Sequence, residues 1–428
     1  MIGEKRAKER FEMSHSKNSE QPNADRRALL RGAVGGTSLG LARRLGLPLL
    51  FSQAAWANAA ADRNPNRILV IFELSGGNDG LNTVVPYADD AYYRARPQIG
   101  IKPNKLRKLD DHFGLSPGMA GFEKLYKDGK LAIVHGCGYE NPSFSHFTSM
   151  AYWHTAAPNS GEEYGWVGRL ADAMDPQITP NYIVNIDATQ SLAVRSRMHT
   201  PVVFDDPEKF TRNAFFDEKP LFDKLAEADP SMNSTQRYLV DVARSAQESS
   251  ALVREAWAKY RTPVDYGIVS LHLAKVAALI DAGMPTRLYY VAYRNNAFDT
   301  HVQQSDLHQR LLTYASDAVY GFMKDMERIG RADDVSMMVF SEFGRRVPEN
   351  TSLGTDHGAA NVMFLAGKHV KGGHYGEVPS LTKLDPGDNL LYTTDFRRVY
   401  ATAMQGWMGY SDARKVLRGE FEPFPVFG

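Results

Sequence analysis

RILVIFEL, residues 67–74, is a nearly continuous run of apolar and β-branched side chains, closed by the glycines Gly76 and Gly77. A strand with one face in water alternates polar and apolar residues. A continuous apolar run is instead typical of a strand buried on both faces of a parallel sheet. The stretch therefore predicts a central strand of an α/β domain.

Similar short apolar runs recur along the chain, at 130–136, 181–186, 286–293, 335–340 and 361–367. Helical patterns lie between several of them, at 268–282 and at 303–330. In the second pattern, apolar residues repeat at helical spacing: Leu307, Leu311, Ala315, Ala318, Phe322 and Met326. Strands that alternate with helices predict an α/β fold with a largely parallel central sheet, in one domain spanning 61–428. Within it, the polar, helix-rich stretch 190–265 suggests a helical insertion.

The charge of the chain is balanced but unevenly distributed. Its 428 residues hold 50 basic and 50 acidic side chains, and a net charge of zero gives no reason to expect a nucleic-acid partner. Residues 1–60 hold ten of the basic and five of the acidic side chains, which leaves 40 basic and 45 acidic for a mildly acidic body. Cys137 is the single cysteine, so no intrachain disulfide can form.

The basic leader, residues 1–60, has the pattern of a twin-arginine export signal. Arg26-Arg27 precede a weakly apolar, Gly-rich run and the small-residue pattern of residues 55–59, which predicts cleavage near Ala57 or Ala59. An amphipathic membrane helix or a transmembrane anchor is the alternative, but Arg43-Arg44 interrupt the run. We therefore expect a disordered start, the twin-arginine machinery as a partner, and a periplasmic or secreted bacterial protein with no membrane span in its mature form.

Candidate site residues follow the expected strands, because ligands bind beyond the carboxyl ends of strands in parallel sheets. In "FDTH", Asp299 and His301 are one residue apart, so in an extended segment they point the same way. A carboxylate and an imidazole on one face make half of a site for Zn²⁺ or Mn²⁺. The plainer reading is that His301 caps the helix that follows.

Two further acidic residues, each in a glycine-containing motif, could either form a turn or bind a metal. "GTDHG" contains Asp356 and His357, which by themselves suggest a tight turn with Asp356 as a hydrogen-bonding side chain. Beside the pair at 299 and 301, they could instead complete a metal site. Asp79 in "SGGNDGLN" is either part of a glycine turn or a metal-binding carboxylate at the end of the first strand.

Two further motifs could bind or attack an anion. Ser145 in "NPSFSHF" precedes an expected helix, where it is either an N-cap or a hydroxyl nucleophile activated by a metal. In "SEFGRR", Glu342 and Arg345 follow the strand at 335–340. An arginine beside a metal suits a phosphate or sulfate group, and a surface ion pair is the alternative.

The motifs "GGNDGLN", "NPSFSHF", "FDTH", "SEFGR", "GTDHG" and "TTDFRRVYA", with the leader, resemble those of the DUF1501 family of exported bacterial proteins. The resemblance runs from about residue 66 to the C-terminus. That family is placed beside the alkaline phosphatase and sulfatase superfamily. The resemblance therefore implies an alkaline-phosphatase-like three-layer αβα sandwich and a metal-assisted hydrolase site.

The superfamily pattern, carried over by resemblance, assigns roles to these positions. Asp79 is the acid after the first strand, and Ser145 is the nucleophile. Asp299, His301 and His357 form one metal site. The pattern's next Asp-His pair falls on Glu342-Phe343, and Phe343 cannot bind a metal.

The second metal site is therefore incomplete unless His146 or Asp356 contributes to it. We expect one firm ion and a second that is weak or absent. Zinc is the expected ion, with Mn, Mg or Ca as alternatives.

These features predict an exported metal-dependent hydrolase of phosphate or sulfate esters, with Ser145 and Arg345 as catalytic residues. The alternative is a non-catalytic binding or assembly protein that kept the fold. A weaker alternative is a carbohydrate-processing protein with a polysaccharide-derived substrate.

Overall fold

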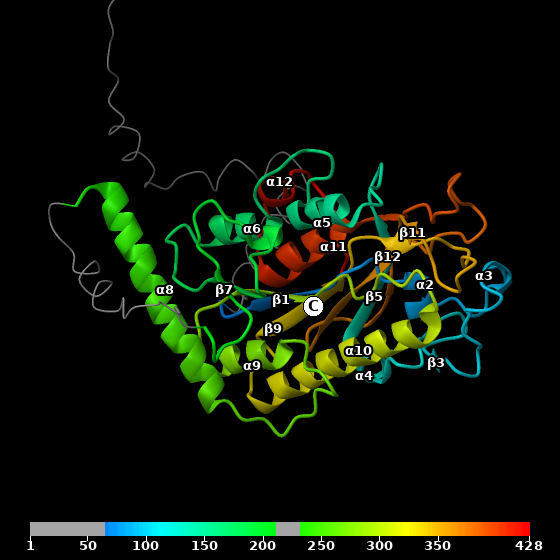
Figure 1. Cartoon of the computed structure of the whole chain (residues 1–428), viewed down its shortest axis with the longest axis horizontal. Coiled ribbons are helices and arrows are strands. Elements are labelled where there is room, and N and C mark those ends of the chain that lie inside the picture. Colours follow the sequence, from blue (N-terminus) through cyan, green and yellow to red (C-terminus); the bar gives the residue numbers. More distant parts are fainter. Residues whose placement is uncertain (1–64, 211–231) are drawn as a thin grey trace, which may run out of the picture. The chain divides into compact units, whose positions relative to one another are not determined.

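The run Ile68–Leu74 forms β1 at the centre of a nine-stranded sheet (Figure 1). The computed structural model describes residues 65–210 and 232–428, so the predicted leader lies outside the described residues. β1 pairs in parallel with β8 (Leu288–Tyr293) on one side and β9 (Val335–Phe340) on the other, and all seven of its residues are buried. The prediction of a central, doubly buried strand is confirmed.

The sheet is parallel except for one strand. Its order is β13 (Gly373–Tyr375), β5 (Leu131–Gly138), β12 (Asn361–Gly367), β9, β1, β8, β6 (Ile183–Ile186) and β7 (Val202–Phe204), with β14 (Thr394–Asp395) also on β5. Within the described residues, only β12 runs against its neighbours. Each of the predicted strands is present, with bounds within two residues of the prediction.

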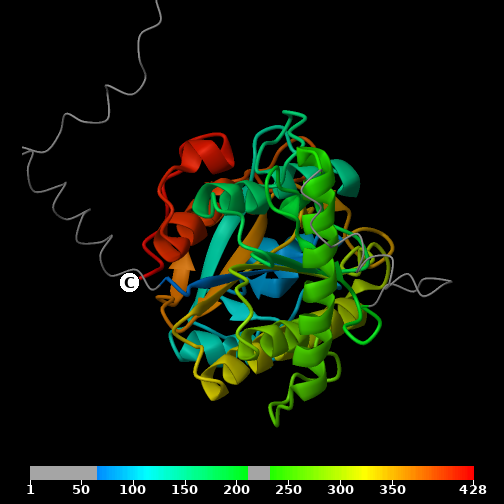
Figure 2. The same cartoon turned by 90° about the vertical axis from the view of Figure 1, so that its left-hand side faces the viewer.

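Helices cover both faces of the sheet (Figures 1 and 2). Alternate residues of β1 point into two cores, Val70 and Phe72 into one, Leu69 and Ile71 into the other. Against the first core lie α4 (Ala120–Lys127), α8 (Ser234–Lys259), α9 (Leu273–Asp281) and α10 (Gln304–Arg328). Against the second lie α5 (His146–Thr155), α6 (Trp166–Met174), α11 (Phe396–Ala401), the π-helix η3 (Thr402–Met408) and α12 (Ala413–Leu417). The three-layer αβα sandwich is confirmed.

The predicted helices differ from the observed ones mainly at their starts. The pattern at 303–330 forms α10. The pattern at 268–282 begins only at Leu273, because Leu271 and His272 adopt positive φ angles of 47° and 65° that a helix cannot include. The stretch 190–265 supplies the 3₁₀ turn η2 (Leu192–Val194) and the sheet strand β7 as well as α8. Its status as an insertion stays a prediction.

Smaller elements lie at the edge where the parallel strands end. They are α2 (Gly80–Thr83), α3 (Asp90–Ala95), the sheet of β2 (Val84–Val85), β3 (Arg107–Lys108) and β4 (Gly114–Leu115), and the ribbon of β10 (Gly344–Arg345) and β11 (His357–Gly358). The start of β12 lies at this same edge, because β12 is reversed. Across residues 65–210 and 232–428, no helix combines the length and apolarity that crossing a bilayer requires.

Candidate metal centre

Asp299 is the point at which three histidines meet. Its Oδ1 lies 2.9 Å from Nε2 of His301 and 3.2 Å from Nε2 of His357. Its Oδ2 lies 3.4 Å from Nε2 of His146. The Nε2 atoms of His301 and His357 are 2.9 Å apart. The structure thus brings the predicted residues Asp299, His301 and His357 together and adds His146, from the start of α5.

The spacing of these atoms fits a small cation. One ligand atom from each of His146, Asp299 and His357 lies within 4.8 Å of the others, and this is the one such cluster in the described part of the chain. Ligands at about 2.0–2.1 Å around a tetrahedral Zn²⁺ are separated by about 3.3 Å. The separations of Asp299 from each histidine, and of His301 from His357, are 2.9–3.4 Å and are of that size.

Each histidine is held by its other ring nitrogen. Nδ1 of His357 lies 2.7 Å from the carbonyl oxygen of Phe144, which can only accept, so this nitrogen carries the proton. Nδ1 of His146 lies 2.8 Å from Oε1 of Glu342, and Nδ1 of His301 lies 3.4 Å from Oδ1 of Asp356. The hydrogen-bond network therefore assigns the lone pairs to the Nε2 atoms.

An unsatisfied atom supports the same conclusion. Nε2 of His146 is buried and has no hydrogen-bond partner, although it faces Asp299 and the ring of His357. A buried polar atom without a partner is costly and calls for a ligand, an ion or a water. The side chains of His146, Asp299 and His357 therefore fit a divalent metal ion, and His301 borders them.

The protonation states also suit a metal. Burial opposes ionisation of Asp299, but the hydrogen bond and charge of Arg345, with help from His357 and His301, lower its pKa to about 2. Burial, together with the charge of Arg345, lowers the pKa of His357. Metal ligands must be deprotonated, so an anionic Asp299 and a neutral His357 are the forms that bind. The hydrogen bond to Glu342 raises the pKa of His146 against the effect of burial, so a metal would displace a proton there.

Glu342 contacts His146 through Nδ1, the ring nitrogen on the other side from Nε2. Its fully buried carboxylate accepts the backbone N–H of Gly76 at 2.9 and 3.1 Å and the hydroxyl of Ser341 at 3.0 Å. The sequence predicts Glu342 as a ligand of a second ion, and this stays a prediction. In the structure its oxygens bind the end of β1 and orient His146.

Asp356 lies on the far side of His301. Its carboxylate also accepts from Asn350 at 3.2 Å, and although burial opposes this, the bonds from Asn350 and His301 lower its pKa. Asp356 is thus placed to orient His301. Its predicted role as a direct ligand stays a prediction.

Arg345 is buried at this edge of the sheet, with 1% of the residue exposed. Its N–H groups donate to Asp299 Oδ1 at 2.8 Å and to the carbonyl oxygens of Gly76, Gly77, Phe298 and Thr355. These bonds use Nε and both terminal nitrogens. The sequence predicts that Arg345 holds an anion, and this stays a prediction. In the structure its donors bond Asp299 and the backbone of three loops.

Asp79 is bonded to residues outside the cluster of metal-ligating side chains. It is fully buried, forms an ion pair of 2.6 Å with Arg96, and caps α2 by accepting the backbone N–H groups of Leu81 and Asn82. Gln304 also donates to it. Burial opposes ionisation, but the charge of Arg96 keeps the pKa of Asp79 low. Both carboxylate oxygens of Asp79 therefore have hydrogen-bond partners. A metal-binding role for Asp79 stays a prediction.

Ser145 directly precedes His146 in the chain. It is the N-cap residue of α5, with extended backbone angles, but its hydroxyl makes no capping bond. The side chain is exposed. Its position at a helix start next to a candidate ligand is the one that a nucleophile or an anion-binding hydroxyl needs.

Phe343 forms an apolar wall beside the centre. Its buried ring lies 4.9 Å from the ring of His146 and 4.7 Å from that of His357, measured between centroids. Gly77, with a φ of 70°, lies so close that a Cβ there would approach Cε2 of Phe343 to 2.1 Å. Phe343, which cannot bind a metal, thus packs against two of the histidines.

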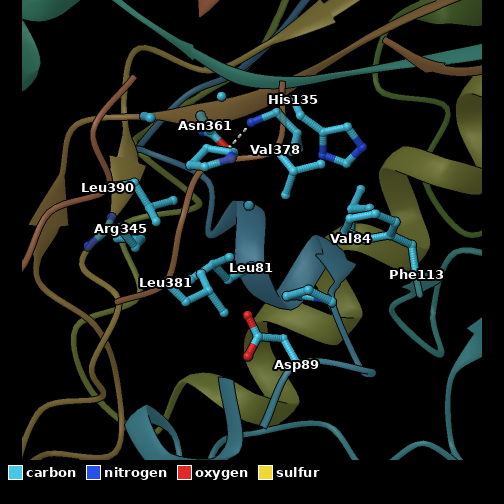
Figure 3. A pocket seen from close by; sticks show the side chains of 16 residues that line it. Leu81, Val84, Asp89, Phe113, His135, Arg345, Asn361, Val378, Leu381 and Leu390 are labelled. Carbon is cyan, nitrogen blue, oxygen red and sulfur yellow. Dashed lines mark hydrogen bonds between the residues drawn. The ribbon is translucent and has the colours of Figure 1, made fainter. Parts of the chain in front are cut away.

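A separate cavity of about 50 Å³ lies at the same edge of the sheet (Figure 3). Its lining is mostly apolar and includes Leu81, Val84, Val378, Leu381 and Leu390. His135, Asn361 and Arg345 supply polar atoms. The cavity adds no member to the cluster of metal-ligating side chains.

Comparison with protein-family models matches residues 66–419 to the family described as "Protein of unknown function (DUF1501)". The chain belongs to the DUF1501 family. None of the curated proteins matches it.

Solved structures similar to this DUF1501 protein share 10–12% of its sequence. A protein in the alkaline phosphatase superfamily from Vibrio parahaemolyticus has a TM-score of 0.33, with 74% of this chain and 64% of that chain covered at 10% identity. The PsFucS1 sulfatase from Pseudoalteromonas sp. has a TM-score of 0.37, with 84% and 71% covered at 10% identity. The C-terminal periplasmic domain of EcEptC from Escherichia coli, in complex with Zn, has a TM-score of 0.35, with 82% and 86% covered at 12% identity.

His146 is the member of the DUF1501 centre that the sequence named only as a supplement to a second site. The signal available was its place directly after Ser145, in the first turn of an expected helix. The contact between His357 and the carbonyl of Phe144 had no such signal, because a backbone acceptor leaves no mark on the sequence.

Proposed function

We propose that this DUF1501 protein is an exported metal-dependent hydrolase of phosphate or sulfate esters. The observation that supports it best is the convergence of Nε2 atoms from His146, His301 and His357 on the carboxylate of Asp299. The imidazoles of His146 and His357 and the carboxylate of Asp299, with His301 beside them, favour zinc, with manganese as the next choice, over the all-oxygen sites that Mg²⁺ and Ca²⁺ prefer.

A bound metal would polarise an ester oxygen and lower the pKa of a bound water or hydroxyl. The residues of the chain would prepare the site for it. Glu342 and the carbonyl of Phe144 hold the Nδ1 protons of His146 and His357, so their Nε2 lone pairs stay directed inward. Arg345 keeps Asp299 ionised and in place.

We assign the binding of the anionic ester group, and the nucleophilic attack on it, to residues at the start of α5. The exposed hydroxyl of Ser145 lies at the amino end of a ten-residue helix, where unpaired N–H groups and the helix dipole favour negative charge. We assign Ser145 as the nucleophile. Arg345 acts through Asp299, because its donors are already bonded.

A single ion is the stoichiometry that the surroundings favour. The ring of Phe343 fills one side of the centre, Glu342 is bonded to Gly76 and Ser341, and Asp79 is paired with Arg96. These are the positions that a second ion would have to use.

The alternative, a non-catalytic binding or assembly protein, is favoured by a different feature. If all four side chains bind one ion, the protein fills every position of a tetrahedral site, as in structural zinc sites. A catalytic ion must keep a position open, which requires five-coordination or the loss of one ligand.

Hydrolysis of aryl phosphates and aryl sulfates by the zinc-loaded protein tests the proposal. Wild type should turn over at least one class, whereas Ser145→Ala and Asp299→Asn should be slower by about 100-fold or more. Equal rates for all three proteins would reject the hydrolase. A wild type that binds zinc but hydrolyses neither class would favour the non-catalytic alternative.

We also propose export through the twin-arginine machinery, on the evidence of the leader in residues 1–60. Replacing Arg26 and Arg27 together by lysine should retain the protein in the cytoplasm of a bacterial host. Replacing Arg43 and Arg44 in the same way is the matched control. Periplasmic accumulation of both variants would contradict this route.

A further inference from the structure

Gln304, the first residue of α10, joins two of the loops that carry the candidate metal ligands. Its side-chain oxygen Oε1 accepts the hydroxyl of Thr300 at 3.2 Å and the hydroxyl of Thr355 at 2.6 Å. Thr300 lies between Asp299 and His301, and Thr355 belongs to the motif "GTDHG", which supplies another of the histidines. One amide oxygen therefore bonds both loops.

The other end of the amide is anchored on Asp79. Its Nε2 donates to Oδ2 of Asp79 at 2.5 Å, and the same oxygen accepts from Arg96 at 2.6 Å. An ionised carboxylate can only accept, so Asp79 determines which end of the Gln304 amide is the nitrogen. The amide oxygen must then face the two threonine hydroxyls, which both donate to it.

This network is closed to water. Each of its members is at most 1% exposed: Asp79, Thr300, Gln304 and Thr355. Backbone bonds run beside the side chains, because the N–H of Gln304 donates to the carbonyl of Leu353 at 2.8 Å and the N–H of Thr355 donates to that of Thr300 at 3.4 Å. A buried hydrogen bond that is lost leaves its partners unpaired, so the network restricts how far the two loops can move apart.

We propose that Gln304 is a positioning residue of the metal centre: it sets the spacing between the two ligand loops, and Asp79 anchors it. The inference rests on the proposed function, because it assumes that these loops bind an ion. Oδ1 of Asp299 and Nε2 of His357, one ligand atom from each loop, lie 3.2 Å apart. Since metal affinity depends on how the ligands are held, loss of the amide should weaken the binding of an ion without removing any ligand.

Metal binding to two variants of the full chain tests the proposal. Gln304→Met keeps the length of the side chain and removes the amide, and Thr355→Val removes the shorter of the two threonine bonds. The zinc affinity measured by calorimetry should fall about tenfold in each variant. The visible absorption spectrum of bound Co²⁺ should also change in shape, because it reports the geometry of the ligands.

Thr402→Val is the matched control. Thr402 is as buried as Thr355, and its hydroxyl donates to the carbonyl of Arg398 at 2.7 Å, at the start of η3. Thr402→Val should lower the midpoint of urea unfolding as Thr355→Val does, but should leave the zinc affinity and the cobalt spectrum unchanged.

The outcomes separate this inference from the hydrolase. Weaker zinc binding and an altered cobalt spectrum in Thr355→Val, with wild-type values in Thr402→Val, support the positioning role even if no ester is hydrolysed. Wild-type affinity and spectrum in Thr355→Val would overturn it, whether or not Gln304→Met folds, and would leave the hydrolase standing. Equal loss of affinity in Thr355→Val and Thr402→Val would also overturn it, because the effect would then follow stability alone. A wild type that binds no zinc would overturn both.

Discussion

Nδ1 of His146 lies 2.8 Å from Oε1 of Glu342, across 196 positions of sequence. This contact joins the first turn of α5 to the end of β9. Glu342 is fixed in turn by the backbone N–H of Gly76 at the end of β1. The ends of β1 and β9 and the start of α5 therefore orient the imidazole of His146. At the same edge of the sheet, Arg345 donates a hydrogen bond to Asp299 and holds it in place. The centre is assembled by loops that the parallel sheet brings together.

Substitution of Arg345 should lower the free energy of unfolding, because its main role is to hold Asp299 and the surrounding loops in place. Lysine cannot reproduce its bonds to Asp299 and four carbonyls, and the buried acceptors would be left unpaired. We expect Arg345→Lys to lower the free energy of unfolding by about 3–5 kcal/mol in urea titrations. Arg414→Lys, which alters an exposed pair with Glu420, should change it by less than about 0.5 kcal/mol. A fully stable Arg345→Lys with weakened phosphate binding would instead make Arg345 an anion-binding residue.

Gly77 and Gly129 offer a matched pair for the packing of Phe343. Both have a φ of 70°, but a Cβ at Gly129 would meet nothing within 4 Å, whereas one at Gly77 would collide with the Phe343 ring. Gly129→Ala should therefore show the backbone cost alone, about 1–2 kcal/mol. Gly77→Ala should cost about 1–3 kcal/mol more, because the ring must move. Equal costs in chemical unfolding would show that Phe343 is not tightly packed.

The pH dependence of stability should report on His199. Its ring nitrogens lie 3.0 Å from Asp172 and 3.1 Å from Asp175, and although burial opposes it, these bonds raise the pKa of His199. Stability gained from a raised pKa is fully present below the unfolded value of about 6.5 and is lost as pH rises through the folded value.

His199→Gln should therefore cost about 1–3 kcal/mol at pH 6 and progressively less toward pH 9. His369→Gln, at a surface pair with Asp333, is the control for a general effect of losing a histidine. A His199→Gln penalty that is independent of pH would show that the ring is neutral in the folded protein.

The fold was more predictable than the site. Continuous apolar runs such as 335–340 identify buried strands, because both faces of a parallel sheet are covered. Residue type, together with the place of the motifs at strand ends and the family resemblance, also indicated Asp299, His301 and His357. The partners of Asp79 and Arg345 could not be predicted from the sequence. Arg96 comes close to Asp79, and the carbonyls of Phe298 and Thr355 come close to Arg345, only through tertiary packing. Sequence shows which residues can bind an ion, but not which are already bonded to something else.

Zinc binding to the intact chain tests the central claim most directly. Native mass spectrometry and calorimetric titration should show one Zn²⁺ per chain. The affinity should fall by about 100-fold or more in Asp299→Asn and His146→Ala, and should be unchanged in His369→Ala. Two ions per chain, no bound ion, or an affinity unaffected by Asp299→Asn and His146→Ala would contradict a single centre built on Asp299 and the three histidines.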